Sequence, residues 1–250
     1  GAGLDNIDMD YCAAKNLQVV FSPAGNANAV AEHGLLLMLA CAKRFNYVDK
    51  QFRSGNFLVR MGMKNTVELE GMTVGMIGCG RISQLLMKKC KYGMGMKVIG
   101  YDPYLTQDKV GDLVELKATA KEVWEQADFV SVHLPVVDST KYSIGREQFS
   151  WMKPTASFIN VARGALIKEN ELIECLKDGT LFQAGLDVFD SEPIKKESEE
   201  LFNLDNVIMT PHMAATTLQS VINCCTSVAN DIVAVCNGKA PVTPAIKPKF

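Results

Sequence analysis

Short runs of β-branched and apolar residues alternate along this chain with longer stretches of helical periodicity. The predicted strands are residues 17–21, 73–77, 97–101, 128–133, 156–161, 182–188 and 206–210. Strand, helix and strand in this order favour a mostly parallel sheet, because a parallel connection must cross back over one face. The pattern therefore predicts an α/β fold with a doubly wound parallel sheet that helices cover on both faces.

Two long helices divide the chain into parts. The apolar spacing over 26–47 predicts a long, mostly buried helix, and a second helix is expected over 217–236. We expect a small first part at 1–24, a main domain at 25–213, and a C-terminal helix and tail at 214–250 that return to the first part. The opening residues look like the middle of a domain, so we expect further chain upstream.

Composition excludes several classes of protein. The 250 residues carry a net charge of −2 that is spread along the chain, which gives no reason to expect nucleic acid or an anionic membrane surface as a partner. The eight cysteines lie in apolar segments without metal-site spacing, so we expect reduced thiols and no metal. The longest apolar run, 34–42, is too short to cross a membrane, and no signal peptide opens the chain. These features favour a cytoplasmic protein with a small-molecule ligand.

A glycine-rich turn follows the predicted strand at 73–77. Gly78 permits a tight turn, and Gly80 lets backbone N–H groups approach a pyrophosphate at the start of the helix that Arg81 and Ile82 open. Ser83 stands where a third glycine is expected, and we expect a small packing adjustment there. The turn predicts a Rossmann dinucleotide site.

Asp102 ends the next strand, some twenty residues beyond the glycines. A carboxylate at this position accepts hydrogen bonds from an adenosine ribose and repels a 2′-phosphate, which favours NAD over NADP. The alternative is that Asp102 only begins an Asp-Pro turn.

Arg163, Glu192 and His212 each follow a predicted strand. Hydride transfer to a 2-keto acid needs a cation that binds the carboxylate and polarises the carbonyl, and the planar fork of arginine suits this role. It also needs an acid near neutral pH, which a histidine beside a carboxylate supplies. Taken one by one, the three residues could be a surface arginine, a solvated turn and a loop. Their shared place after strands favours a catalytic set.

The chain has three histidines. His33 lies in the long apolar helix, where a satisfied structural histidine is the favoured interpretation. His133 ends a central strand and could line a cofactor cleft, but no acid is near it in sequence. His212 has Glu192 on the preceding strand exit as a partner. His212 is therefore the predicted proton donor.

These motifs resemble the D-2-hydroxyacid dehydrogenase family, and the resemblance runs through nearly the whole chain. It implies a Rossmann domain joined to a fragment of a flavodoxin-like substrate domain, with Arg163, Glu192 and His212 catalytic. The substrate would contact Ala2, Gly3, Arg163 and His212. The implied NAD-binding residues are Gly78, Gly80, Arg81, Ile82, Asp102, His133, Pro135, Thr140, Val161, Ala162 and Asp187.

The resemblance also implies finer features. Asp187 would face the nicotinamide amide, and the family pairs through its cofactor domain, so a homodimer is expected. The related formate dehydrogenases carry glutamine where this chain has Glu192, which favours a hydroxy acid. Most of the family's N-terminal substrate domain is not in this sequence, so the chain as given could turn over poorly.

Two alternatives stay open. One is an NAD(H)-sensing module similar to the corepressor branch of the same family, whose output is protein binding. The weaker one is another NAD protein, such as a homocysteine-nucleoside hydrolase. The sequence does not name the acid, and 3-phosphoglycerate is one candidate.

Overall fold

The computed structural model describes residues 3–4, 6–194 and 199–245. The chain divides into two compact units, one of residues 31–214 and the other of residues 1–30 and 215–250. We describe each unit by itself. Ala2 lies outside the described residues.

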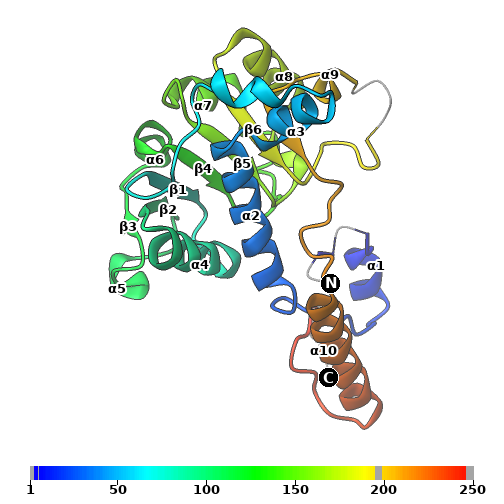
Figure 1. The fold of residues 1–250 in the computed structure, drawn as a ribbon. Helices are drawn as coiled ribbons and strands as arrows, with labels where there is room; N and C mark the ends of the chain where they lie inside the picture. The colour runs from blue at the N-terminus through cyan, green and yellow to red at the C-terminus, as the bar shows by residue number, and fades with distance from the viewer. Residues whose placement is uncertain (1–2, 5, 195–198, 246–250) are drawn as a thin grey trace. The chain divides into compact units, whose positions relative to one another are not determined.

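A parallel sheet forms the centre of the larger unit (Figure 1). Among the described residues it has seven strands, all parallel, in the order β3-β2-β1-β4-β5-β6-β7. The chain thus winds outward from β1 in one direction and from β4 in the other, which is a Rossmann-like arrangement. The strands are β1 (Thr73–Ile77), β2 (Lys97–Tyr101), β3 (Glu115–Leu116), β4 (Phe129–Val132), β5 (Ser157–Asn160), β6 (Gln183–Leu186) and β7 (Val207–Met209).

The strand register sets the carboxyl edge of the sheet. Ile77 is aligned with Tyr101 and with Val132, Asn160 is aligned with Val132 and Leu186, and Leu186 with Met209. The first residues beyond this row are Gly78, Asp102, His133, Val161, Asp187 and Thr210. Because the strands are parallel, all six loops leave from the same edge.

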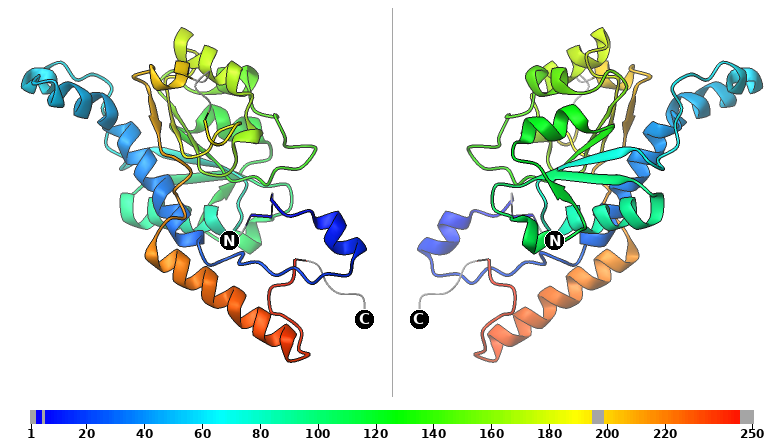
Figure 2. Two further views of the ribbon diagram at one scale, coloured as in Figure 1. Left: turned by 90° about the vertical axis from the view of Figure 1, so that its right-hand side faces the viewer. Right: turned by 90° about the vertical axis from the view of Figure 1, so that its left-hand side faces the viewer.

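Helices cover both faces of the sheet (Figures 1 and 2). Their bounds are α2 (Ala27–Ala42), α3 (Phe45–Arg53), α4 (Arg81–Lys88), α5 (Gln107–Val110), α6 (Ala120–Gln126), α7 (Arg146–Trp151), α8 (Glu169–Asp178) and α9 (Glu199–Phe202). Three short helical turns complete the described part of this unit. They are the 3-10 turns η1 (Phe57–Met61) and η3 (Gly164–Leu166) and the π-type turn η2 (Lys89–Gly93), which extends α4. Figure 2 shows α3, beyond α2 along the chain, extending away from the sheet.

The core is apolar and closely packed. Trp124 stacks on Phe158 at 5.9 Å between ring centroids, and Phe149 meets Phe158 edge-on at 5.2 Å; all three rings are buried. Glycines let helices approach the strands, since a Cβ at Gly75 would lie 2.6 Å from Val123 of α6. This packing fixes the sheet on which the loops stand.

The smaller unit joins both ends of the chain. It contains α1 (Met9–Ala14) and α10 (Leu218–Cys236), and Val20 forms an isolated antiparallel bridge with Pro244. Asp231 of α10 accepts backbone hydrogen bonds from Val242 at 2.7 Å and Thr243 at 3.0 Å. Among the described helices, α10 is long and apolar enough to cross a membrane by length and composition alone, which is weak support for a span.

Two expectations about elements were wrong, and one element was missed. The strand expected at 17–21 is reduced to the bridge of Val20 with Pro244, in which Val19 and Phe21 share backbone hydrogen bonds with Ala245 and Thr243. The helix expected over 26–47 ends at Ala42, where Arg44 takes a left-handed backbone conformation (φ 50°) before α3 begins. The two-residue strand β3 was not predicted, since Glu115 and Leu116 are too few to show a pattern.

Candidate active site

The glycine loop follows β1 and begins α4. Gly78 has a φ of +89°, and a Cβ there would lie 2.8 Å from the carbonyl oxygen of His133, so the position requires glycine. Gly80 is the N-cap of α4, with no heavy atom within 4 Å of where its Cβ would stand. Arg81 is exposed and Ile82 half-buried. The loop therefore offers open backbone at the positive end of a helix.

Asp102 lies directly beside this loop. Its carboxylate accepts hydrogen bonds from the backbone N–H of Cys79 at 2.9 Å and from that of Tyr104 at 2.9 Å. Cys79 is fully buried, and burial, with a further contribution from Asp102, raises the pKa of its thiol to about 12. These two hydrogen bonds hold the Asp102 carboxylate against the glycine turn. The contact of this carboxylate with an adenosine ribose stays a prediction.

Ser83 occupies the third-glycine position on α4. Its side chain is fully buried, and no described group lies within hydrogen-bonding distance of its Oγ. Its hydroxyl is left without a hydrogen-bond partner among the described residues, which costs free energy.

His133 begins the loop after β4. Its Nε2 lies 3.0 Å from Ser131 Oγ, and burial lowers the pKa of the imidazole to about 4. It is therefore neutral at pH 7, which suits a lining residue rather than a proton donor. Further along, Thr140 Oγ1 donates to the carbonyl of Pro135 at 2.6 Å and accepts from Val137 N–H at 2.9 Å, which folds the loop on itself.

The loop after β5 carries Arg163. The buried side chain of Asn160 accepts from Ala162 N–H at 3.0 Å and donates to the carbonyl of Arg163 at 2.9 Å. The Arg163 guanidinium donates to the carbonyl of Ala162 at 2.8 Å, and Val161 is buried. Asn160 thus fixes the backbone that presents the arginine.

Glu192 and His212 meet. The Nδ1 of His212 lies 2.5 Å from Glu192 Oε2, and the other oxygen of Glu192 accepts from Phe189 N–H at 3.0 Å. Their side chains are 48% and 34% exposed, so the pair remains open to a ligand. The carboxylate fixes the ring orientation and leaves Nε2 as the reactive nitrogen.

The arginine and glutamate loops interlock at Gly164. A Cβ there would lie 1.9 Å from the carbonyl carbon and oxygen of Phe189, which only glycine allows. The loop after β5 and the loop after β6 are therefore in backbone contact.

Asp187 has a structural environment that the sequence did not indicate. It is fully buried, and its carboxylate accepts from Thr210 Oγ1 at 2.5 Å, Met213 N–H at 2.9 Å and Ala214 N–H at 2.9 Å. Burial raises the pKa of the Asp187 carboxyl, but these hydrogen bonds and one from His33 together lower it by more. The net shift of the pKa is therefore downward. The observed partners tie Asp187 to the His212 loop, and its contact with a nicotinamide amide stays a prediction.

The structure therefore brings Glu192 and His212 together, packs the arginine loop on theirs, and sets the glycine loop and Asp102 side by side. Thr210 and His33 were missed as parts of the site. His33 is 9% exposed and hydrogen-bonded, as expected of a satisfied histidine, but its partner is Thr210. A polar residue two positions before the predicted catalytic histidine was the signal for Thr210. Gly3 is described and exposed.

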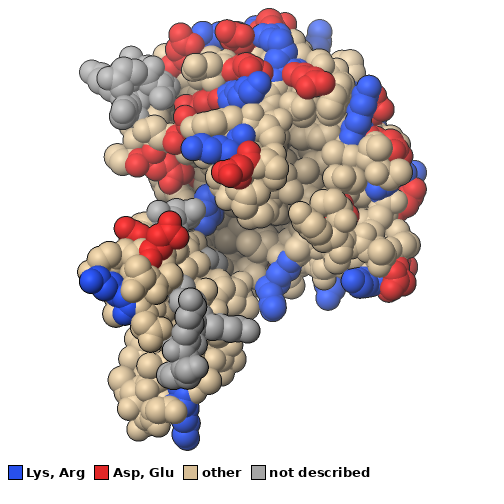
Figure 3. All heavy atoms as spheres, turned by 180° about the vertical axis from the view of Figure 1, so that it is seen from behind, with Lys and Arg blue, Asp and Glu red and all other residues tan. Residues whose placement is uncertain are grey.

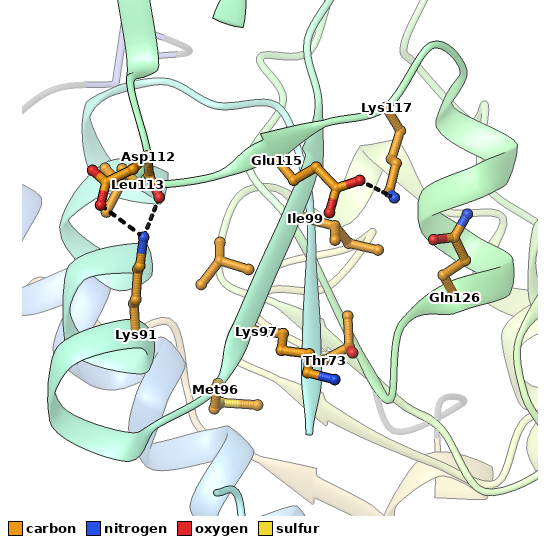
Figure 4. Close-up of a pocket in the computed structure, with 11 residues that line it drawn as sticks. Thr73, Lys91, Met96, Lys97, Ile99, Asp112, Leu113, Glu115, Lys117 and Gln126 are labelled. Atoms are coloured by element: carbon orange, nitrogen blue, oxygen red, sulfur yellow. Dashed lines mark hydrogen bonds and ion pairs between the residues drawn. The ribbon is translucent and has the colours of Figure 1, made fainter. Parts of the chain in front are cut away.

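A pocket elsewhere on the sheet is lined by none of the candidate site residues (Figure 4). It has a volume of about 440 Å³ and is lined by the first residues of β1 and β2, Thr73 and Lys97, at the edge opposite the loops. Lys91 and Lys117 there pair with Asp112 and Glu115. Among the described residues, no group of three or more His, Cys, Asp or Glu side chains could hold a metal ion.

Comparisons with known proteins match this arrangement. Residues 35–214 match the family model of the D-isomer specific 2-hydroxyacid dehydrogenase NAD binding domain. The chain is 40% identical to D-3-phosphoglycerate dehydrogenase of Methanocaldococcus jannaschii over 96% of this chain and 45% of that one. It is 35% identical to glyoxylate reductase of Pyrococcus furiosus over 96% of this chain and 72% of that protein.

A solved structure agrees. D-lactate dehydrogenase of Aquifex aeolicus, solved with NAD and lactic acid, superposes with a TM-score of 0.88 at 27% identity, over 100% of this chain and 79% of that one. The chain spans about half the length of the phosphoglycerate dehydrogenases that it matches.

Proposed function

The chain belongs to the D-isomer specific 2-hydroxyacid dehydrogenase family, and from this premise we propose that it transfers hydride between NAD(H) and a small D-2-hydroxy acid or its 2-keto acid. The observation that carries the proposal is the contact between His212 Nδ1 and Glu192 at 2.5 Å. A sensing module has no need for a proton donor oriented in this way. 3-Phosphoglycerate is one candidate substrate, since a relative with that activity is 40% identical.

The matched domain binds NAD. The residues present fit this cofactor, because Gly80 leaves open space for backbone contact and Asp102 is held at the glycine turn. When bound, NAD supplies the hydride acceptor or donor. We propose that the pyrophosphate and ribose contact Gly78, Gly80, Arg81, Ile82 and Asp102, and that His133, Pro135, Thr140, Val161 and Ala162 line the rest. The Asp102 carboxylate favours NAD over NADP by repelling a 2′-phosphate.

The chain's own residues then carry the acid–base and electrostatic steps. Arg163 binds the substrate carboxylate and stabilises negative charge on the reacting oxygen, an effect worth a few kcal/mol at such sites. His212 delivers a proton to that oxygen in reduction and removes it in oxidation. Glu192 stabilises the charged imidazole and fixes its orientation. Ala2 and Gly3 are proposed to contact the substrate carboxylate.

Several features beyond the chemistry are also proposals. Residues 1–24 and 214–250 are proposed to belong to a flavodoxin-like substrate domain, a view supported by the bridge between Val20 and Pro244. Eight free thiols favour a reducing, cytoplasmic compartment. On the face in Figure 3, acidic and basic side chains are interspersed, which favours a small-molecule ligand over nucleic acid.

We also propose a homodimer. The segment of α3 and η1 that extends from the sheet carries strongly exposed apolar side chains, a composition typical of an interface. They are Phe45 (61%), Phe52 (57%), Phe57 (59%), Leu58 (68%) and Met61 (77%). Light scattering of the purified protein tests this: a monomer at micromolar concentration would contradict it.

The decisive test is the variant His212→Asn. Asparagine tolerates the left-handed backbone of this position (φ 50°) and removes the imidazole. With a panel of 2-keto acids, including a phosphorylated one, we expect NADH-dependent reduction to fall by about 10³-fold or more while NADH binding survives. Unchanged turnover in the variant would contradict the proposal. A wild type that reduces no keto acid but associates on adding NADH would favour the sensing module.

A further inference from the structure

We propose that His33 and Thr210 are positioning residues for His212: with the buried carboxylate of Asp187 they form a partly buried hydrogen-bond network that holds the histidine loop in its reactive conformation. The inference rests on the proposed function, and it assigns a role to a helix that does not itself reach the reacting atoms. His33 lies on α2, 177 residues before its partner Thr210 in the sequence.

The direction of each hydrogen bond follows from the number of protons. Thr210 has one hydroxyl proton, and the ionised carboxylate of Asp187 can only accept, so Thr210 donates to Asp187 at 2.5 Å. The hydroxyl oxygen of Thr210 must then accept from His33 Nε2, which lies 2.8 Å away and also stands 3.4 Å from Asp187 Oδ1. The proton of His33 is therefore on Nε2, and His33 is the first donor of the chain.

Asp187 passes this restraint to the backbone around His212. Its side chain accepts from Met213 N–H and Ala214 N–H, and its main-chain carbonyl accepts from His212 N–H at 2.8 Å. Thr210, Met213 and Ala214 thus bracket His212 on both sides. The carboxylate is fully buried, so solvent does not compete for these bonds.

The restraint matters because His212 has a φ of 50°, a left-handed backbone conformation that is uncommon for any residue except glycine, although histidine adopts it more often than most. Such a residue persists only where surrounding contacts determine it. Here the contacts come from the carboxylate that His33 and Thr210 orient. If that carboxylate turns, the His212 backbone relaxes and its ring leaves Glu192.

The test uses paired variants. His33→Leu and Thr210→Val remove the donor or the hydroxyl at nearly constant volume, whereas His33→Gln keeps an N–H near the position of Nε2. With NADH and a 2-keto acid that the wild type reduces, we expect kcat to fall about tenfold or more in His33→Leu and Thr210→Val, and His33→Gln to recover most of it. NADH affinity, measured by fluorescence titration, should change less than about twofold. The kcat of the double variant His33→Leu/Thr210→Val should be no lower than that of either single variant, since both substitutions interrupt the same hydrogen-bond network.

A matched control separates positioning from stability. Gln183 is also buried and donates to Cys41 carbonyl at 3.1 Å and Ser157 Oγ at 2.8 Å, but at the start of β6, away from the loops. Gln183→Met should lower the melting temperature as His33→Leu does and leave kcat unchanged. Equal loss of kcat in Gln183→Met, unchanged kcat in His33→Leu, or no recovery in His33→Gln would each overturn the positioning role.

A spectroscopic readout keeps this result independent of turnover. The proton shared by His212 and Glu192 should give a downfield imidazole signal in proton NMR, assigned by its loss in His212→Asn. We expect His33→Leu to lose or broaden this signal and His33→Gln and Gln183→Met to retain it. If the wild type reduces no keto acid, the proposed function fails while this signal still decides the positioning. An unchanged signal in His33→Leu overturns it.

Discussion

The two halves of the carboxyl edge are built differently. After β1 and β2, the glycine loop and Asp102 are tied by short-range backbone contacts, with open space at Gly80. After β5, β6 and β7, the loops are locked to each other through Gly164, Asp187 and the contact of Glu192 with His212. The first half leaves the backbone uncovered at Gly80, and we call it the open half. In the second, hydrogen bonds and close backbone contact join the loops, and we call it the rigid half. One sheet edge thus combines an open backbone, which suits cofactor binding, with interlocked loops, which suit the positioning of side chains.

The variants Gly164→Ala and Gly80→Ala should show the largest difference between the two halves. At Gly164 the added carbon meets the Phe189 backbone at 1.9 Å, so the loops must separate. We expect about 3 kcal/mol lower stability in urea unfolding and a loss of roughly 10²-fold in kcat/KM. At Gly80 the carbon meets no described atom, so stability should change by less than about 1 kcal/mol and NADH affinity should fall about tenfold. Equal effects on stability would show that the halves do not differ.

Glu192→Gln tests the charge in the rigid half. The amide keeps a hydrogen bond to His212 but no longer stabilises a charged imidazole, so kcat/KM for keto acid reduction should fall about 10²-fold with NADH affinity unchanged. Glu169→Gln is the control, because Glu169 lies nearby and accepts a backbone hydrogen bond from Asp190 N–H. If both variants behave alike, the Glu192 charge has no special role.

Acid should weaken the protein through His133. Burial lowers the pKa of His133 from 6.5 to about 4. Between pH 6.5 and pH 4, the imidazole is therefore protonated in the unfolded chain but neutral in the folded one. Stability from the neutral ring is therefore lost as the pH falls from about 6.5 towards 4. The difference in unfolding free energy between wild type and His133→Asn should narrow over this range in urea titrations. A difference that is constant with pH would contradict a lowered pKa of His133 in the folded protein.

Ser83→Ala, in the open half, should have the smallest effect on stability. Removing a buried hydroxyl that has no described partner should stabilise the fold by about 1 kcal/mol in thermal or urea unfolding. NADH affinity should stay the same, since the loop backbone does not change. A loss of stability would show that the hydroxyl is bonded.

The sequence predicted the open half better than the rigid half. The glycine turn, Asp102 and the strands at 73–77 and 97–101 depend on local residue patterns, and the structure has both strands with these bounds. The pairing of Glu192 with His212 was also expected, because both follow neighbouring strands. The bonds of Asp187 and His33 could not be predicted, since they join residues far apart in sequence whose types are common in ordinary cores.

The thiol of Cys79 has a chemical consequence for its neighbourhood. With a pKa of about 12, only about one molecule in 10⁵ carries a thiolate at pH 7. Thiolates add readily to electrophiles, and both an oxidised nicotinamide ring and a keto acid carbonyl are electrophiles. Burial under the glycine turn thus allows a sulfur atom to lie between the two glycines of the loop without becoming a competing nucleophile.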